Sequence, residues 1–150
     1  MMQRNNFDIR KAEVSDVSEL AELEKLCFSA PWSENALRET MEGDNSCFLV
    51  AEENGRVCGY IGSYYALDEG YITNVAVHPD CRRRGIGQAL VGELVECGKQ
   101  LGLLFLTLEV REGNCAAISL YEKLGFKNVG KRPRFYTNPS EAAVLMTIYI

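Results

Sequence analysis

The residues with the clearest chemical potential lie in two stretches of the sequence. The first is the basic segment from Arg82 to Gln88, in which three consecutive arginines precede two glycines. Arginine stays charged at neutral pH, and glycine lets a bulky phosphate approach the backbone closely. The second stretch carries Glu109, Asn114 and Tyr121, which offer a carboxylate, an amide and a phenol. These residue types suit an anion site in the first stretch and proton transfer in the second.

The basic segment lies between a predicted strand and a predicted helix. A short apolar run that includes Val75, Ala76 and Val77 has strand character, and Pro79 stops it. Apolar residues then recur at helical spacing over 86–101. At such a turn, free backbone N–H groups and the positive end of the helix dipole face an anion together. The predicted anion site comprises Arg82, Arg83, Arg84, Gly85, Ile86, Gly87 and Gln88.

Other phosphate motifs fit this segment badly. A P-loop requires Gly-x-x-x-x-Gly-Lys-Ser/Thr, and the sequence contains no such string. A dinucleotide fingerprint requires a third glycine at the position that Leu90 occupies. The remaining alternative to an anion site is a capped helix start with a solvated basic turn.

Glu109 lies inside an otherwise apolar predicted strand, 104–110, where a carboxylate is costly unless it faces a cleft or a partner. Partial burial would raise its pKa towards the range of a general base. The alternatives are a salt bridge to Arg111 or an exposed strand end. On the helix predicted over 114–123, Tyr121 is either a proton donor or a core tyrosine, and Asn114 is a helix cap or a ligand group.

Composition limits the class of protein. With 150 residues and 47% hydrophobic content, we expect one domain, 1–150, with its own core. No apolar run approaches the ~20 residues of a membrane span, and the N-terminus lacks a secretory signal. Six scattered cysteines and a single histidine indicate reduced thiols, no metal site and a cytoplasmic location. A net charge of -5 argues against nucleic-acid binding.

Strands and helices interleave along the chain, which predicts an α/β mixed sheet with helices on its faces. Strands are expected over 7–11, 47–53, 57–66, 70–77, 104–110, 127–132 and 143–150, the last two flanking a loop that contains Pro133, Tyr136 and Pro139. Asn54-Gly55 is a strong hairpin signal. Ser15 or Asp16, with Glu19, is expected to cap a first helix, and Ser33 a second one that runs to about residue 41. Gly102 is expected to end the helix over 86–101. The strand over 104–110 is apolar enough to be covered on both faces.

The Arg-x-x-Gly-x-Gly segment resembles the acyl-CoA pyrophosphate loop of the GCN5-related N-acetyltransferase (GNAT) family. The resemblance implies that Val75, Ala76 and Val77 hold the pantetheine arm and that 82–88 hold the pyrophosphate of acetyl-CoA. It also implies the GNAT fold, a mixed, mostly antiparallel sheet of about seven strands with about four helices.

Four further segments resemble one branch of that family, the bacterial ribosomal-protein-alanine N-acetyltransferases. These segments are 27–33, 72–77, Leu108-Glu109-Val110-Arg111 with Asn114, and 120–126. The resemblance implies that Glu109 is the general base, that Tyr121 is the general acid and contacts the cofactor, and that Asn114 binds pantetheine. By analogy, Phe28, Trp32 and Tyr136 line the acceptor groove. The implied acceptor is the N-terminal alanine of a small-subunit ribosomal protein; the alternatives are a different amine or a CoA-binding module without turnover.

Overall fold

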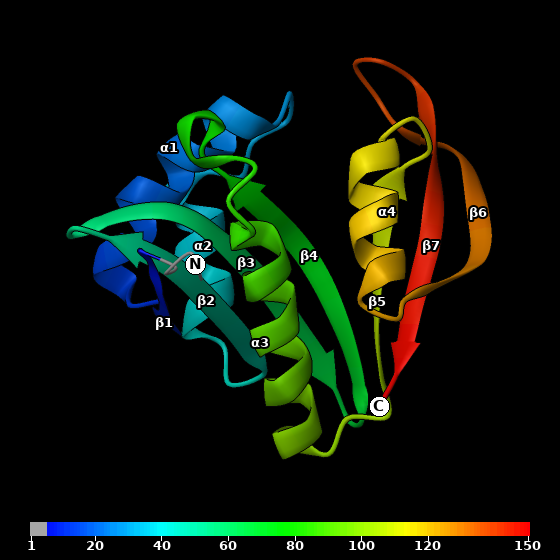
Figure 1. Ribbon diagram of the computed structural model, residues 1–150, viewed down its shortest axis with the longest axis horizontal. Coiled ribbons are helices and arrows are strands. Elements are labelled where there is room, and N and C mark those ends of the chain that lie inside the picture. The colour runs from blue at the N-terminus through cyan, green and yellow to red at the C-terminus, as the bar shows by residue number, and fades with distance from the viewer. Residues whose placement is uncertain (1–5) are drawn as a thin grey trace, which may run out of the picture.

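The structure is a computed structural model in which we describe residues 6–150 (Figure 1). Its elements in chain order are β1 (Asp8–Lys11), a 3-10 turn (Val14–Asp16), α1 (Val17–Cys27), α2 (Glu34–Glu42), β2 (Ser46–Glu53), β3 (Arg56–Ala66), β4 (Glu69–Val77), a second 3-10 turn (Pro79–Cys81), α3 (Ile86–Leu101), β5 (Phe105–Arg111), α4 (Cys115–Lys123), β6 (Lys127–Tyr136) and β7 (Glu141–Tyr149).

The strands form one seven-stranded sheet in the order β1-β2-β3-β4-β5-β7-β6. All neighbouring pairs are antiparallel except β4 and β5, which are parallel. This arrangement confirms the predicted mixed, mostly antiparallel sheet with four helices. Because β4 and β5 run in the same direction, the chain must cross over between them, and α3 makes that crossover.

Two apolar clusters cover the two faces of the sheet. The larger joins α3 and α4 to the sheet, with Leu90 and Phe126 among its most deeply buried members. The smaller lies between α1, α2 and strands β2 to β4, and contains Leu20 and Leu37. In Figure 1, α3 and α4 lie in front of the sheet, whereas α1 and α2 lie behind its N-terminal half. Strands β5 to β7 therefore have a helix on one face and none on the other.

Several local predictions are confirmed. Asn54 and Gly55 both have positive φ, 52° and 77°, as the tight turn between β2 and β3 requires. The Ser33 side chain accepts a hydrogen bond from the Ala36 N–H and caps α2. Gly102 ends α3 in the left-handed conformation, with φ of 77°.

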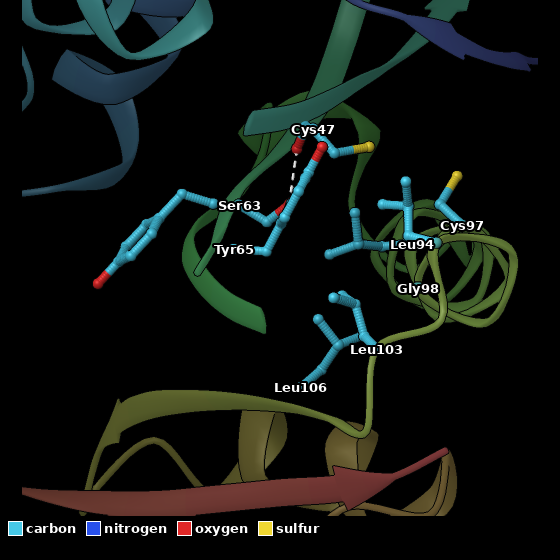
Figure 2. Close-up of a pocket in the computed structure, with 10 residues that line it drawn as sticks. Cys47, Ser63, Tyr65, Leu94, Cys97, Gly98, Leu103 and Leu106 are labelled. Atoms are coloured by element: carbon cyan, nitrogen blue, oxygen red, sulfur yellow. Dashed lines mark hydrogen bonds between the residues drawn. The ribbon is translucent and has the colours of Figure 1, made fainter. Parts of the chain in front are cut away.

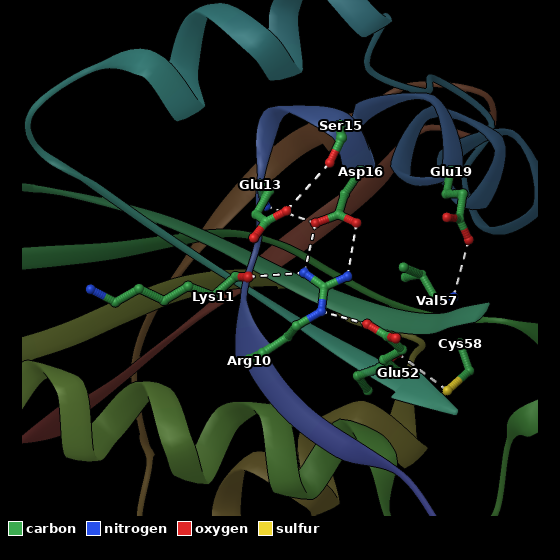
Figure 3. Close-up of polar contacts among 10 residues, drawn as sticks. Arg10, Lys11, Glu13, Ser15, Asp16, Glu19, Glu52, Val57 and Cys58 are labelled. Atoms are coloured by element: carbon green, nitrogen blue, oxygen red, sulfur yellow. Dashed lines mark hydrogen bonds and ion pairs between the residues drawn. The ribbon is translucent and has the colours of Figure 1, made fainter. Parts of the chain in front are cut away.

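The predicted cap of α1 is wrong. The Asp16 carboxylate accepts the Glu13 N–H inside a 3-10 turn and both terminal nitrogens of Arg10, at 2.8 and 2.9 Å (Figure 3). Glu19 turns instead to β3, where its carboxylate accepts the Val57 N–H at 3.0 Å. A charged partner from β1 outcompetes the local cap because charge-assisted hydrogen bonds are the stronger ones.

Two predictions for the C-terminal half also need correction. β5 is not covered on both faces: Leu106, Leu108 and Val110 are buried, and the residues between them are half-buried. The predicted loop after residue 132 is largely strand, because β6 continues through Pro133 to Tyr136. A proline is tolerated there because β6 is an edge strand and one side of it needs no backbone donor.

Candidate active site

The candidate site is the place where β4 and β5 separate. Their parallel pairing covers three positions and ends at Tyr71 and Thr107. Figure 1 shows the two strands diverging beyond that point. On its other side, β4 stays paired with β3 as far as Val77. The edge of β4 that faces β5 therefore has no strand partner beyond Tyr71, and an extended ligand with amide groups needs such an edge.

A β-bulge in β4 decides which way these residues point. Asn74 pairs with Gly62 and Ile72 with Ser63, so Thr73 is an extra residue without a partner. As a result Ile72 faces the α3 side, whereas Asn74 turns to α1 and hydrogen-bonds Glu24 there. Val75 and Val77 pack against the α3 side and keep their main chain at the open edge.

The predicted anion site has the expected backbone form. Gly85 precedes the 16-residue helix α3 with φ of 78°, and Arg83 is also left-handed, with φ of 64°. This places the first N–H groups of α3 at the end of the turn, as anion binding requires. Gly87 lies in the first turn of α3, where an added Cβ would make only ordinary contacts with Leu120 and Val77.

The three arginines are not equivalent. Arg84 is paired with Glu53 of β2, and this contact raises the pKa of Arg84 and lowers that of Glu53. Arg82 folds back on β4, where its Nε donates to the Val77 carbonyl at 3.3 Å. Arg83 makes no side-chain hydrogen bond or ion pair within residues 6–150. Its guanidinium can therefore approach an anion without losing a partner.

Glu109 lies two residues beyond the last β4–β5 pair, on the sheet face opposite α4. Its side chain is 32% exposed, and its nearest cation is Arg132 at 4.0 Å. The alternative salt bridge to Arg111 does not form, because Arg111 pairs with Glu141 at 3.2 Å. Glu109 is thus half-buried and loosely held, a setting in which a carboxylate can exchange a proton.

Tyr121 lies on α4, buried against Phe126 with ring centroids 5.7 Å apart. Burial, with a smaller contribution from Tyr136, raises the pKa of Tyr121 to about 12. The pKa of Tyr136 is itself raised, first by burial and then by the Glu109 carboxylate. The Glu109 carboxylate thus acts on Tyr136 and Tyr136 acts on Tyr121, whereas Glu109 and Tyr121 themselves lie on opposite faces of the sheet.

The remaining predicted site residues are Asn114, at the start of α4, and Phe28 and Trp32, between α1 and α2. Asn114 caps α4, because its side-chain oxygen accepts the Ala117 N–H at 3.2 Å, and the cap leaves its amide nitrogen available. Trp32 is half-buried against the α1–α2 cluster, whereas Phe28 is 39% exposed. The Trp32 backbone N–H donates to Glu24 at 2.9 Å, which fixes the connection between α1 and α2.

Sequence reasoning overlooked Glu24. This carboxylate is 1% exposed and also accepts the Tyr60 hydroxyl at 2.6 Å and the Asn74 amide at 3.2 Å. The signal was present, because Glu24 follows Leu20 by four residues and so lies on the apolar side of α1.

A separate pocket lies between α3 and strands β2 and β3 (Figure 2). Its ten lining residues, among them Cys47, Cys97 and Leu106, include none of the predicted site residues. Burial raises the pKa of Cys47 to about 11, so this thiol stays protonated at neutral pH. Across residues 6–150 no cluster of side chains could hold a metal ion, and no helix is long and apolar enough to cross a membrane.

Comparison with known proteins decides the family. The profile of the acetyltransferase (GNAT) family matches residues 17–126. The chain belongs to the GNAT family. It is an N-acetyltransferase.

Relatives of this GNAT protein match it over nearly its whole length. A putative [ribosomal protein bS18]-alanine N-acetyltransferase of Bacillus subtilis is 33% identical over 95% of both chains. The [ribosomal protein bS18]-alanine N-acetyltransferase of Haemophilus influenzae is 36% identical over 95% of this chain and 98% of its own.

Solved structures of other N-acetyltransferases have the same fold as this chain. The ribosomal-protein-S18-alanine N-acetyltransferase of Escherichia coli superposes with a TM-score of 0.90 at 33% identity, covering 96% of this chain and 94% of its own. The PaiA N-acetyltransferase of Thermoplasma acidophilum, solved in complex with coenzyme A, shares the fold at 21% identity, with a TM-score of 0.81 and coverage of 96% and 99%.

Proposed function

We propose that this protein transfers the acetyl group of acetyl-CoA to the N-terminal alanine of a small-subunit ribosomal protein. The observation that carries the reaction type is the position of Glu109, half-buried and loosely held just beyond the point where β4 and β5 separate. The printed names of relatives that match nearly the full chain support the acceptor. Such a substrate suits the cytoplasmic location expected from the sequence, and one continuous sheet supports a single domain.

The residues present fit acetyl-CoA. Val75, Ala76 and Val77, where β4 has no strand partner on the β5 side, would hold the pantetheine arm through their backbone, together with the Asn114 amide. The turn from Arg82 to Gln88 would hold the pyrophosphate, with the N–H groups of α3 and the Arg83 guanidinium as donors. Bound there, acetyl-CoA supplies an activated acetyl group with a thiolate leaving group.

The chain's own groups would then manage the protons. Glu109 takes a proton from the acceptor ammonium, directly or through water, so that the amine nitrogen can bond to the acetyl carbon. A backbone N–H near Val75 stabilises the negative charge that develops on the carbonyl oxygen. The C–S bond breaks, and Tyr121 gives its proton to the departing sulfur. Since the pKa of Tyr121 is raised to about 12, the phenol is protonated at neutral pH and carries the proton that this step needs.

Acceptor recognition would fall to the two sides of the open face. Phe28 and Trp32 form the side next to α1, and Tyr136 forms the side next to β6. Part of this surface is exposed and apolar, which suits a peptide chain.

A peptide acetylation assay tests this proposal. Purified protein and acetyl-CoA are incubated with a peptide that has a free N-terminal alanine, or with one that has a blocked N-terminus and an internal lysine. We expect acetylation of the alanine peptide alone, read by mass and by release of CoA. Acetylation of the lysine peptide alone would overturn the acceptor, and bound CoA without either product would overturn turnover on these acceptors.

A further inference from the structure

The connection between β6 and β7 is held by one side chain from β5. Arg111 donates through Nη1 to the Pro139 carbonyl at 3.0 Å and through Nη2 to the Thr137 carbonyl at 3.1 Å. Its guanidinium also lies over the Tyr136 ring, 4.5 Å from the centroid. Three residues of the segment 136–139 are thereby tied to the strand that carries Glu109. A surface connection between two strands is ordinarily among the more mobile parts of a fold.

Glu141 extends this clamp to the loop before α4. One carboxylate oxygen pairs with Arg111 at 3.2 Å, and the other accepts the Gly113 N–H at 2.6 Å. A Cβ at Gly113 would lie 2.6 Å from that oxygen, so any other residue there would make the carboxylate shift. The next residue, Asn114, caps α4 and is a proposed pantetheine ligand. The side chains of Arg111 and Glu141 are 28% and 26% exposed, so the pair is partly shielded from solvent.

The group that the clamp holds most directly is Tyr136. Its phenol is close enough to Tyr121 to contribute to the raised pKa of that residue, and close enough to Glu109 for the carboxylate to raise its own pKa. Tyr136 thus interacts electrostatically with both the proposed base and the proposed acid, and its ring contacts Arg111 directly. Its ring cannot leave this place without losing the stack on Arg111.

We propose that Arg111 is a positioning residue for acceptor recognition, which fixes Tyr136 and the β6–β7 connection as one side of the acceptor groove. Through Glu141 and Gly113, the same clamp links that side to the loop that would bind pantetheine. This inference rests on the proposed function, because it assumes that Tyr136 contacts the acceptor.

The test is Arg111→Lys, which keeps the charge but lacks the planar fork that reaches two carbonyls and stacks on a ring. We expect kcat/KM for the alanine peptide to fall about 100-fold, as a displacement of about 1 Å can cause. The Kd of acetyl-CoA should stay within about threefold, since the anion site is untouched. Glu141→Gln is a milder change, because the amide still offers one oxygen as an acceptor. It should lower kcat/KM for the alanine peptide by about tenfold.

Arg10→Lys is the matched control. Arg10 is also a forked guanidinium that binds two carboxylates and a carbonyl, but it lies on β1, at the far edge of the sheet (Figure 3). Its replacement should lower the unfolding temperature and leave the acceptor kcat/KM unchanged. Hydrogen exchange of residues 137–141 gives a readout that needs no activity, and it should accelerate in Arg111→Lys and not in Arg10→Lys.

Unchanged acceptor kcat/KM in Arg111→Lys would overturn the inference even if exchange of 137–141 accelerates, because the clamp would then serve structure alone. An equal loss of acceptor kcat/KM in Arg10→Lys would overturn it as well. If the wild-type protein acetylates neither peptide, the proposed function fails instead, and exchange of 137–141 still decides whether Arg111 is the clamp.

Discussion

Glu24 and Glu109 both lie on the side of the sheet opposite α3 and α4, but the surroundings of the two carboxylates differ. Around Glu24, α1, β3 and β4 enclose the side chain and supply the Trp32 N–H, the Tyr60 hydroxyl and the Asn74 amide as donors. Burial of its phenol raises the pKa of Tyr60, and the neighbouring Glu24 charge raises it further. Within residues 6–150, one buried side-chain atom has no hydrogen-bond partner, and it is the other amide atom of Asn74.

Around Glu109 the surroundings are looser. The side chain is a third exposed, its nearest cation is 4.0 Å away, and the neighbouring arginine is engaged by Glu141. A carboxylate saturated with donors stabilises the fold, and one with few partners keeps its lone pairs for a substrate proton. Two carboxylates near the same face thus differ in how many hydrogen-bond donors already hold them, and this difference supports Glu109 rather than Glu24 as the proposed base.

The largest effect on stability should come from Glu24→Ala. It leaves three buried donors unpaired, each of which costs about 1–3 kcal/mol, so we expect a loss of about 3 kcal/mol or more. Urea denaturation measures it. Glu19→Ala, on the same helix, removes one contact to a backbone N–H and should cost about 1 kcal/mol. If both variants lost the same free energy of unfolding, the three donors to Glu24 would not matter more than the single donor to Glu19.

Tyr121→Phe should have the next largest effect, and it should change kcat rather than stability. The ring and its packing on Phe126 are kept, so the unfolding temperature should not change. Loss of the proton donor should lower kcat about 100-fold. Because the pKa of Tyr121 is about 12, the wild-type rate should show no loss from deprotonation of this residue across the neutral range. An unaltered kcat in the variant would return Tyr121 to the role of a core tyrosine.

The smallest effect should be on the pH dependence of stability, and it comes from Arg10 and Asp16 at the β1 edge of the sheet. Hydrogen bonds from Arg10 lower the pKa of Asp16 in the folded protein. The stabilisation is therefore complete above the unfolded pKa of about 3.9 and is lost as pH falls through the folded value. Urea denaturation at several acidic pH values should show this loss in the wild type and a smaller one in Asp16→Asn. The same pH dependence in both proteins would contradict the assignment.

Local signals made much of this fold predictable. Asn54-Gly55 dictates a tight turn, Ser33 a helix start, and the spacing after Pro79 a change from strand to helix. Each depends on residues adjacent in sequence, and each is confirmed, whereas the anion site predicted at that change stays a prediction.

What the sequence did not reveal depends on long-range partners. The donors to Glu24 come from the α1–α2 connection, β3 and β4, and the cap of α1 was displaced by Arg10 from another strand. Whether Arg111 would pair with Glu109 or Glu141 follows from the pairing of β5 with β7, which places Glu141 near the strand end. Periodicity likewise did not reveal that β5 lacks a helix on one face.

The central claim is that Glu109 is the base, and Glu109→Gln tests it most directly. The amide keeps the size of the side chain but does not accept a proton at neutral pH. In a single-turnover reaction with the alanine peptide, we expect acetyl transfer to slow by about 100-fold or more, with the Kd of acetyl-CoA and the unfolding temperature unchanged. Transfer at the wild-type rate would show that another group takes the proton and would contradict the account.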